Sequence, residues 1–116
     1  MHNKGQEEKR SYPRKPSHLF VRYSYGSNIF TGIALNLSKN GLFIKSVKGL
    51  PVQTRSDVLI PLVQEVLKVP INIQWLIKID MNYSGMGVQV LNPPNEYLDF
   101  VEHFETADNN NHHHTD

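Results

Sequence analysis

The chain has 116 residues, a formal net charge of +1 at pH 7, and hydrophobic residues at 39% of its positions, which suits one globular domain with a modest core. It contains no cysteine, which excludes disulfides, cysteine nucleophiles and cysteine-based metal sites. No apolar run approaches the ~20 residues of a membrane span, and no secretory signal is visible. We therefore expect a cytoplasmic protein that does not insert into membranes.

The charge is unevenly distributed. Residues 1–15 carry five basic and two acidic side chains, a balance of +3, and the rest carries seven basic and nine acidic ones, a balance of −2. Residues 1–8 are predicted to form a flexible tail, and the polar segment 107–116 a disordered one. A single domain is expected over 9–106. Three adjacent histidines at 112–114 lack a fourth ligand placed by structure, so no specific metal site is predicted.

Six segments of this domain have the apolar patterning of β-strands and are separated by turn signals. In the clearest of them, seven apolar residues from Leu67 to Ile79 all occupy odd positions. Pro61 suggests an edge position or a bulge in its strand. Asn40-Gly41 is a hairpin signal, because this pair tolerates positive φ. The six segments are 19–25, 29–35, 42–45, 58–63, 66–79 and 85–90.

The hydrophobic period changes after residue 92. Asn92-Pro93-Pro94-Asn95-Glu96 is a helix-start signal. An apolar stripe with i, i+3, i+4, i+7 spacing follows, formed by Tyr97, Phe100, Val101 and Phe104. It predicts a helix over 94–105 that covers an open end or edge of the strands. The fold class is therefore mainly β: a small six-stranded antiparallel barrel over 16–92 with one C-terminal α-helix.

Two arginines, Arg10 and Arg14, lie four residues apart just before the first strand, with Lys9 preceding them. Guanidinium groups suit planar, bidentate recognition of phosphate and of the O6/N7 edge of guanine. Taken alone, so short a pattern is more typical of a solubilising basic tail.

Asn36 and Ser38 lie two residues apart, so in an extended strand they project to the same face. An amide beside a hydroxyl can bind the edge of a base. Gly41 would let the following turn close without a Cβ clash. Taken alone, these residues are more typical of ordinary turn chemistry.

Catalytic motifs are absent from the sequence. It has no G-x-S-x-G, no P-loop, no H-E-x-x-H and no paired carboxylates in the predicted strands. We therefore expect neither an enzyme nor a cofactor.

In combination, the motifs are more specific. The R-x-x-x-R of Arg10 and Arg14, the N-x-S-x-x-G that begins at Asn36, and the late strand Gly85-Met86-Gly87-Val88 together resemble the PilZ domain family over about 9–105. This resemblance implies a six-stranded barrel that binds the bacterial second messenger cyclic di-GMP.

The resemblance also implies roles for individual residues. Segment 9–15 would be a switch that wraps the ligand, with Arg10 and Arg14 contacting phosphates and guanine edges and Lys9 as a possible further contact. Asn36, where the family more often has Asp, and Ser38 would contact guanine, and Gly41 would shape the turn.

The expected function is a cyclic di-GMP receptor, a monomer or weak dimer, that orders its N-terminal arm on binding and signals to an unidentified protein partner in trans. One alternative is a PilZ-like adaptor that acts through protein contacts without a nucleotide. A second is an oligonucleotide-binding barrel. The −2 balance of the body counts against the second alternative, so we expect no nucleic-acid partner.

Overall fold

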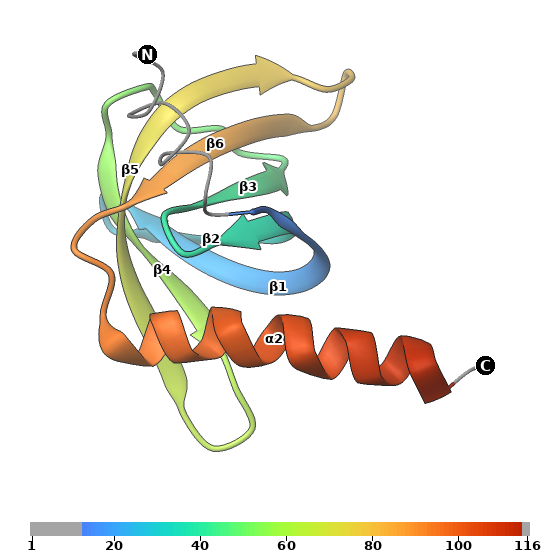
Figure 1. Cartoon of the computed structure of the whole chain (residues 1–116). Coiled ribbons are helices and arrows are strands. Elements are labelled where there is room, and N and C mark those ends of the chain that lie inside the picture. Colours follow the sequence, from blue (N-terminus) through green and yellow to red (C-terminus); the bar gives the residue numbers. More distant parts are fainter. Residues whose placement is uncertain (1–12, 115–116) are drawn as a thin grey trace, which may run out of the picture.

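The computed structural model describes residues 13–114, with side chains as far as residue 104. Six antiparallel strands close into a barrel in the order β1-β2-β3-β6-β5-β4 (Figure 1). This confirms the predicted six-stranded antiparallel barrel with a C-terminal helix. The elements are β1 (Lys15–Tyr25), β2 (Asn28–Ser38), β3 (Gly41–Ser46), β4 (Arg55–Pro61), β5 (Val66–Lys78), β6 (Ser84–Val90) and α2 (Asn95–His114).

The barrel interior is filled by one hydrophobic cluster to which every strand contributes. Because neighbouring residues of a strand face opposite sides of the sheet, alternate residues enter the cluster. In β1, for example, Val21 and Tyr23 are buried while Arg22 between them is exposed. The buried apolar residues are Val21, Tyr23, Ala34, Leu37, Leu42, Ile44, Leu50, Val58, Ile60, Leu67, Val69, Ile71, Ile73, Met86, Val88, Val90, Tyr97 and Val101.

A β-bulge in β5 breaks the single apolar face that the sequence predicted there. Ile73 lies opposite Val88 and Trp75 lies opposite Gly87, which leaves Gln74 as an extra residue. An extra residue reverses the faces to which the following side chains point. The odd-numbered residues as far as Ile73 therefore fill the core, whereas those after it, beginning with Trp75, are exposed on the outer surface.

A second register shift lies in β2. Ala34 pairs with Ile44 and Asn36 pairs with Phe43, so Leu35 is the extra residue. This bulge allows both Ala34 and Leu37 to point into the core. Asn36, between Leu35 and Leu37, is left on the outer surface.

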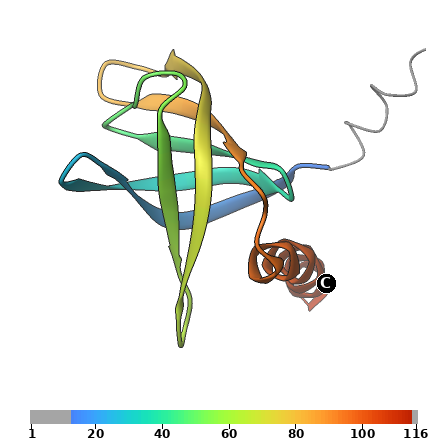
Figure 2. The ribbon, with the colours of Figure 1, turned by 90° about the vertical axis from the view of Figure 1, so that its left-hand side faces the viewer.

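Helix α2 crosses the lower end of the barrel in Figure 1, and Figure 2 shows it end-on beside the strands. Tyr97 and Val101 are buried in the barrel core, and Phe100 and Phe104 pack against it. The backbone N–H groups of Tyr97 and Leu98 donate to the Pro94 carbonyl in the first turn. The predicted stripe and its role in covering one end of the barrel are confirmed.

The helix is longer than the sequence predicted. It continues to His114, whereas the expected end was 105 and a disordered tail was expected over 107–116. The apolar stripe ends at Phe104, so the hydrophobic pattern of the sequence does not indicate that the helix continues beyond it. Once docked turns have nucleated a helix, each added residue gains a backbone hydrogen bond without a new nucleation cost.

Pro61 is the last residue of β4. The pairs that join β4 to β1 are Arg22 with Leu59 and Tyr23 with Val58, so Pro61 lies beyond them. Pro61 therefore has no partner on β1, so its missing N–H group interrupts no pair on that side, as at the edge of a sheet.

We expect Tyr97→Phe to lower the free energy of unfolding. The Tyr97 hydroxyl donates to the Ser38 carbonyl at 2.6 Å, and its loss leaves that carbonyl buried without this partner. Such a loss costs about 1–3 kcal/mol, measurable by urea denaturation. The control Tyr25→Phe removes the hydroxyl of an exposed tyrosine and should change stability by less than about 0.5 kcal/mol. Equal stability of the two variants would contradict a structural role for the Tyr97 hydroxyl.

Candidate functional site

Four residues from four neighbouring strands lie in one row across the outer surface of the barrel. Asn36 pairs with Phe43, Phe43 pairs with Gly87, and Gly87 pairs with Trp75. The extra residues Leu35 and Gln74 immediately precede the two ends of this row. An amide and an indole are therefore fixed on the same sheet surface, with a glycine between them.

Arg14, just before β1, completes one end of this row. Its Nη1 donates to Asn36 Oδ1 at 2.7 Å. Its Nη2 would lie 3.5 Å from a Cβ atom at Gly41, so the guanidinium also covers the start of β3. The sequence motifs that contain Arg14, Asn36 and Gly41 thus meet in space, although 22 residues separate the first two.

Gly41 is required here for close packing rather than for its backbone angle. A Cβ atom at this position would lie 2.8 Å from the Val88 carbonyl oxygen of β6. The predicted hairpin between β2 and β3 is confirmed, since Ser38 pairs with Gly41. It forms without a positive φ at Asn40 or Gly41, because the positive-φ positions of the described residues are Gly26, Gln53 and Asn92. The absent side chain lets β3 and β6 pair closely beside Arg14.

Ser38 lies beneath the surface and not beside Asn36. It is buried, and its hydroxyl donates to Asn40 Oδ1 at 2.8 Å, which is the turn chemistry that the sequence left open. Its carbonyl accepts the Tyr97 hydroxyl of α2. Burial raises the pKa of Tyr97 well above its usual value, and the positive charge of Arg14 opposes part of that rise. Tyr97 therefore stays protonated and joins α2 to the floor of the site.

A shallow pocket of about 230 Å³ opens beside this row. Trp75 supplies its aromatic wall, because the indole covers Gly87, where any Cβ atom would collide with it. The indole also stacks on Phe43 with a centroid distance of 5.4 Å. Gln74 Nε2 donates to Gln89 Oε1 at 2.5 Å along the polar wall. The lining residues are Arg14, Asn40, Gln74, Trp75, Gly87, Val88 and Gln89.

A cation, amide groups and an exposed aromatic surface together suit a planar ligand that carries negative charge. Sequence reasoning identified Arg14, Asn36 and Gly41 but missed Trp75. The available signal was the pair of glycines at 85 and 87, since a glycine within a strand often marks a site of close approach. Phe43 and Trp75 make this approach here. Lys9 and Arg10 lie outside the described residues.

Other kinds of site find no support in the described part of the chain. It contains no group of three His, Cys, Asp or Glu side chains placed to hold a metal ion. None of its helices combines the length and apolar character needed to cross a membrane.

A family model described as "PilZ domain" matches residues 8–105. No curated protein sequence matches the chain. Among solved structures, YcgR from Escherichia coli in complex with c-di-GMP superposes with a TM-score of 0.72 at 12% identity, over 92% of this chain and 49% of that one. The Bacillus subtilis inhibitor of motility, MotI/DgrA, gives 0.64 at 15% identity, over 84% and 52%. The chain thus spans about half the length of each, and these likenesses confirm the fold.

Gly87→Ala should displace the indole of Trp75, since the new methyl group would occupy its place. Trp75 is the single tryptophan of the chain, so its fluorescence reports the site directly. We expect stronger quenching by acrylamide and an emission maximum at longer wavelength than in the wild type. Val63→Ala, at a fully exposed position, is the control. Unchanged quenching in Gly87→Ala would show that the indole does not rest on Gly87.

Proposed function

The chain belongs to the PilZ domain family, and from this premise we propose that it is a receptor for cyclic di-GMP. The observation that carries this proposal is the Arg14 guanidinium bonded to Asn36 at the edge of a pocket walled by Trp75. Two separate parts of the chain that the family resemblance assigns to one ligand meet there. That the structure of YcgR is a complex with the same nucleotide adds support.

The chemistry of the ligand matches the site group by group. Cyclic di-GMP carries two phosphate charges and two guanine bases. We propose that Arg14 binds a phosphate or the O6/N7 edge of a guanine through charge-assisted hydrogen bonds. Asn36 accepts a bond from Arg14 through Oδ1, and its Nδ2 group would donate to a guanine acceptor. A guanine stacked on Trp75 would gain about 1–3 kcal/mol.

The remaining family positions would act in two ways. Ser38 and Gly41 would hold the β2–β3 turn in shape. We retain both as site residues because Ser38 bonds to Asn40 of the pocket and Gly41 leaves room for the Arg14 guanidinium. Arg10, with Lys9 as a possible addition, would close over the ligand from segment 9–15. The resulting surface would then be bound by a protein partner in trans, in the cytoplasm, and the chain would act by binding rather than by catalysis.

We expect wild-type protein to bind cyclic di-GMP saturably in a calorimetric titration and not to bind cyclic di-AMP. Arg14→Ala should weaken binding roughly 10- to 150-fold, since a hydrogen bond to a charged group contributes about 1.5–3 kcal/mol. Arg22→Ala is the matched control, because Arg22 is also an exposed arginine of the N-terminal region but does not line this pocket.

Three results would contradict the receptor assignment or its site. Absence of heat and of competition in a folded sample would favour the nucleotide-independent adaptor. Equal affinities of Arg14→Ala and Arg22→Ala would show that the ligand binds away from the pocket. Binding of single-stranded oligonucleotides in a mobility shift would favour an oligonucleotide-binding barrel.

Hydrogen exchange tests the proposed closure of segment 9–15. On addition of cyclic di-GMP, the amides of this segment should exchange more slowly, because the ligand would hold the backbone between its two arginines. The control peptide covers the turn at Val63, where exchange should not change. Equally fast exchange of segment 9–15 at saturating ligand would rule out the switch while leaving the binding site intact.

A further inference from the structure

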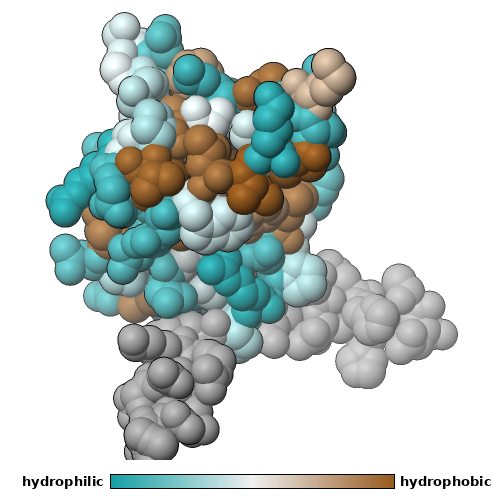
Figure 3. All heavy atoms as spheres, turned by 90° about the horizontal axis from the view of Figure 1, so that it is seen from above, coloured by the Kyte–Doolittle hydropathy of each residue, from teal (hydrophilic) through white to brown (hydrophobic). Residues whose placement is uncertain are grey.

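A second exposed surface adjoins the pocket and is not used by the proposed ligand. It is formed by Phe20, Val47, Ile77, Ile79 and Tyr83, here named the apolar face. All five are exposed, Val47 by 71% and Phe20 by 60%. Seen from above, hydrophobic side chains form a band over this part of the molecule (Figure 3). A contiguous apolar surface of this kind on a soluble domain commonly marks an interaction site.

Strand pairing shows how close this surface lies to the pocket. Ile77 pairs with Gly85, and Gly85 pairs with Lys45. These three residues form the next row with outward-facing positions after the row of Trp75, Gly87 and Phe43. The two rows are adjacent along the same strands. The Trp75–Phe43 stack therefore borders both the pocket and the apolar face.

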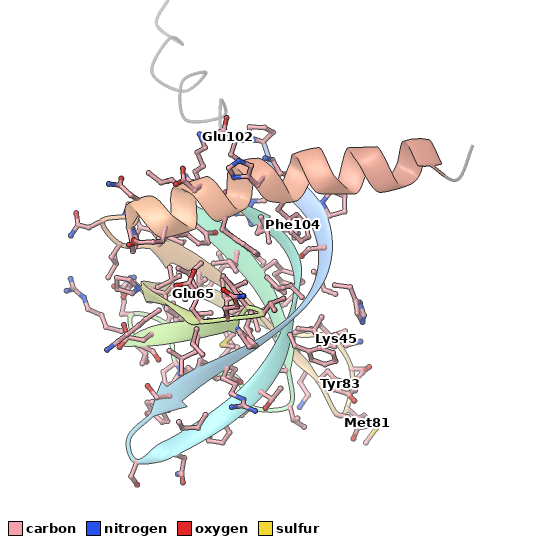
Figure 4. The ribbon with its side chains drawn as sticks, turned by 90° about the horizontal axis from the view of Figure 1, so that it is seen from below. Lys45, Glu65, Met81, Tyr83, Glu102 and Phe104 are labelled. Carbon is pink, nitrogen blue, oxygen red and sulfur yellow. The ribbon has the colours of Figure 1, made fainter. Side chains whose placement is uncertain are left out.

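The apolar face also contains a groove. A hollow of about 200 Å³ lies between Phe20, Ile33, Val47 and Tyr83, with Lys45 on its wall. Figure 4 shows Lys45 and Tyr83 side by side, with Met81 nearby, away from α2. The Lys45 ammonium lies 4.7 Å from the centre of the Tyr83 ring. One apolar side chain of a partner would fit this hollow and place its neighbours beside Lys45.

Three lysines and one carboxylate, that of Asp80, surround the apolar face, so its net charge is positive. Lys45 and Lys48 lie over tyrosine rings, and Lys78 is exposed at the end of β5. Among the described side chains, ion pairs join Lys39 to Glu102 and Lys68 to Asp57, and none involves these three lysines. The carboxylate of Asp80 accepts hydrogen bonds from the backbone N–H groups of Asn82 and Tyr83.

These charges distinguish between two possible occupants. A second copy bound about a two-fold axis would place the same surface on both sides of the contact, so three lysines and one carboxylate would face an equal set. Like charges brought together across an interface are unfavourable. A different protein with carboxylates beside an apolar side chain would instead complement both the groove and the lysines.

We propose that the apolar face is the docking surface for a protein segment that inserts an apolar side chain into the groove and pairs acidic side chains with Lys45 and its neighbours. The link to signalling rests on the proposed function: a nucleotide held against Trp75 would lie at the border of this surface and would be contacted by the docked partner. The surface itself does not depend on that link.

The test is a selection of phage-displayed random peptides on the immobilised full chain, with and without cyclic di-GMP. Enriched peptides should carry Asp or Glu next to a large apolar residue. Val47→Asp should weaken their binding at least 10-fold, whereas Val63→Asp, at a fully exposed position in the β4–β5 turn, should leave it unchanged. Lys45→Glu should favour peptides with Lys or Arg in place of the acidic residues.

Several outcomes would overturn this inference. They are the enrichment of no peptide over a blank surface, equal binding to wild type and Val47→Asp, and a wild-type dimer in sedimentation that Val47→Asp converts to monomer. The nucleotide link is judged separately. If calorimetry shows cyclic di-GMP binding but peptide affinity is the same with and without it, the link is wrong and the docking surface stands. If calorimetry shows no binding of cyclic di-GMP, the proposed function is wrong. The docking surface is then tested by the peptide selection without nucleotide.

Discussion

The register shift between Ile73 and Trp75 determines which side chains the barrel exposes on its outer surface. As far as Ile73, the apolar residues of β5 fill the core. From Trp75 onward the same alternation continues on the opposite side, so residues that would otherwise be buried form the indole wall of the pocket and part of the apolar face. One extra residue, Gln74, thus turns the side chains at the end of a core strand toward the outer surface.

Arg14 connects the other parts of the site. It is bonded to Asn36 on β2, lies against Gly41 at the start of β3, and is near enough to Tyr97 of α2 to affect its pKa. Tyr97 in turn binds the Ser38 carbonyl beneath the pocket. Arg14 therefore interacts with both the β2–β3 turn and the helix, and its replacement would change the surroundings of Asn36, Gly41 and Tyr97.

The six strands and the helix could be predicted from the sequence, because period-two alternation and the Tyr97–Phe104 stripe indicate directly which residues are buried. The resemblance based on Arg14, Asn36 and Gly41 was sufficient to bring these three residues together. The bulge in β5 could not be predicted, since every odd-numbered residue from Leu67 to Ile79 is apolar. Leu76, an apolar residue at an even position, interrupts this alternation but does not identify Gln74 as the extra residue. The burial of Ser38 was also missed. Strict alternation placed it on the same face as Asn36, whereas in the turn its hydroxyl is buried and donates to Asn40 Oδ1.

Closure of the barrel has a consequence for the exposed apolar residues. Strands at the margin of an open sheet present unpaired N–H and C=O groups, and beside apolar side chains they can template the addition of other chains. Here β3 pairs with β6 and β1 pairs with β4, so each of the six strands has neighbours on both sides. Closure thereby reduces the length of strand backbone that is open to intermolecular β-pairing. A surface rich in isoleucine, valine and aromatic residues can then be exposed to solvent with a reduced risk of aggregation.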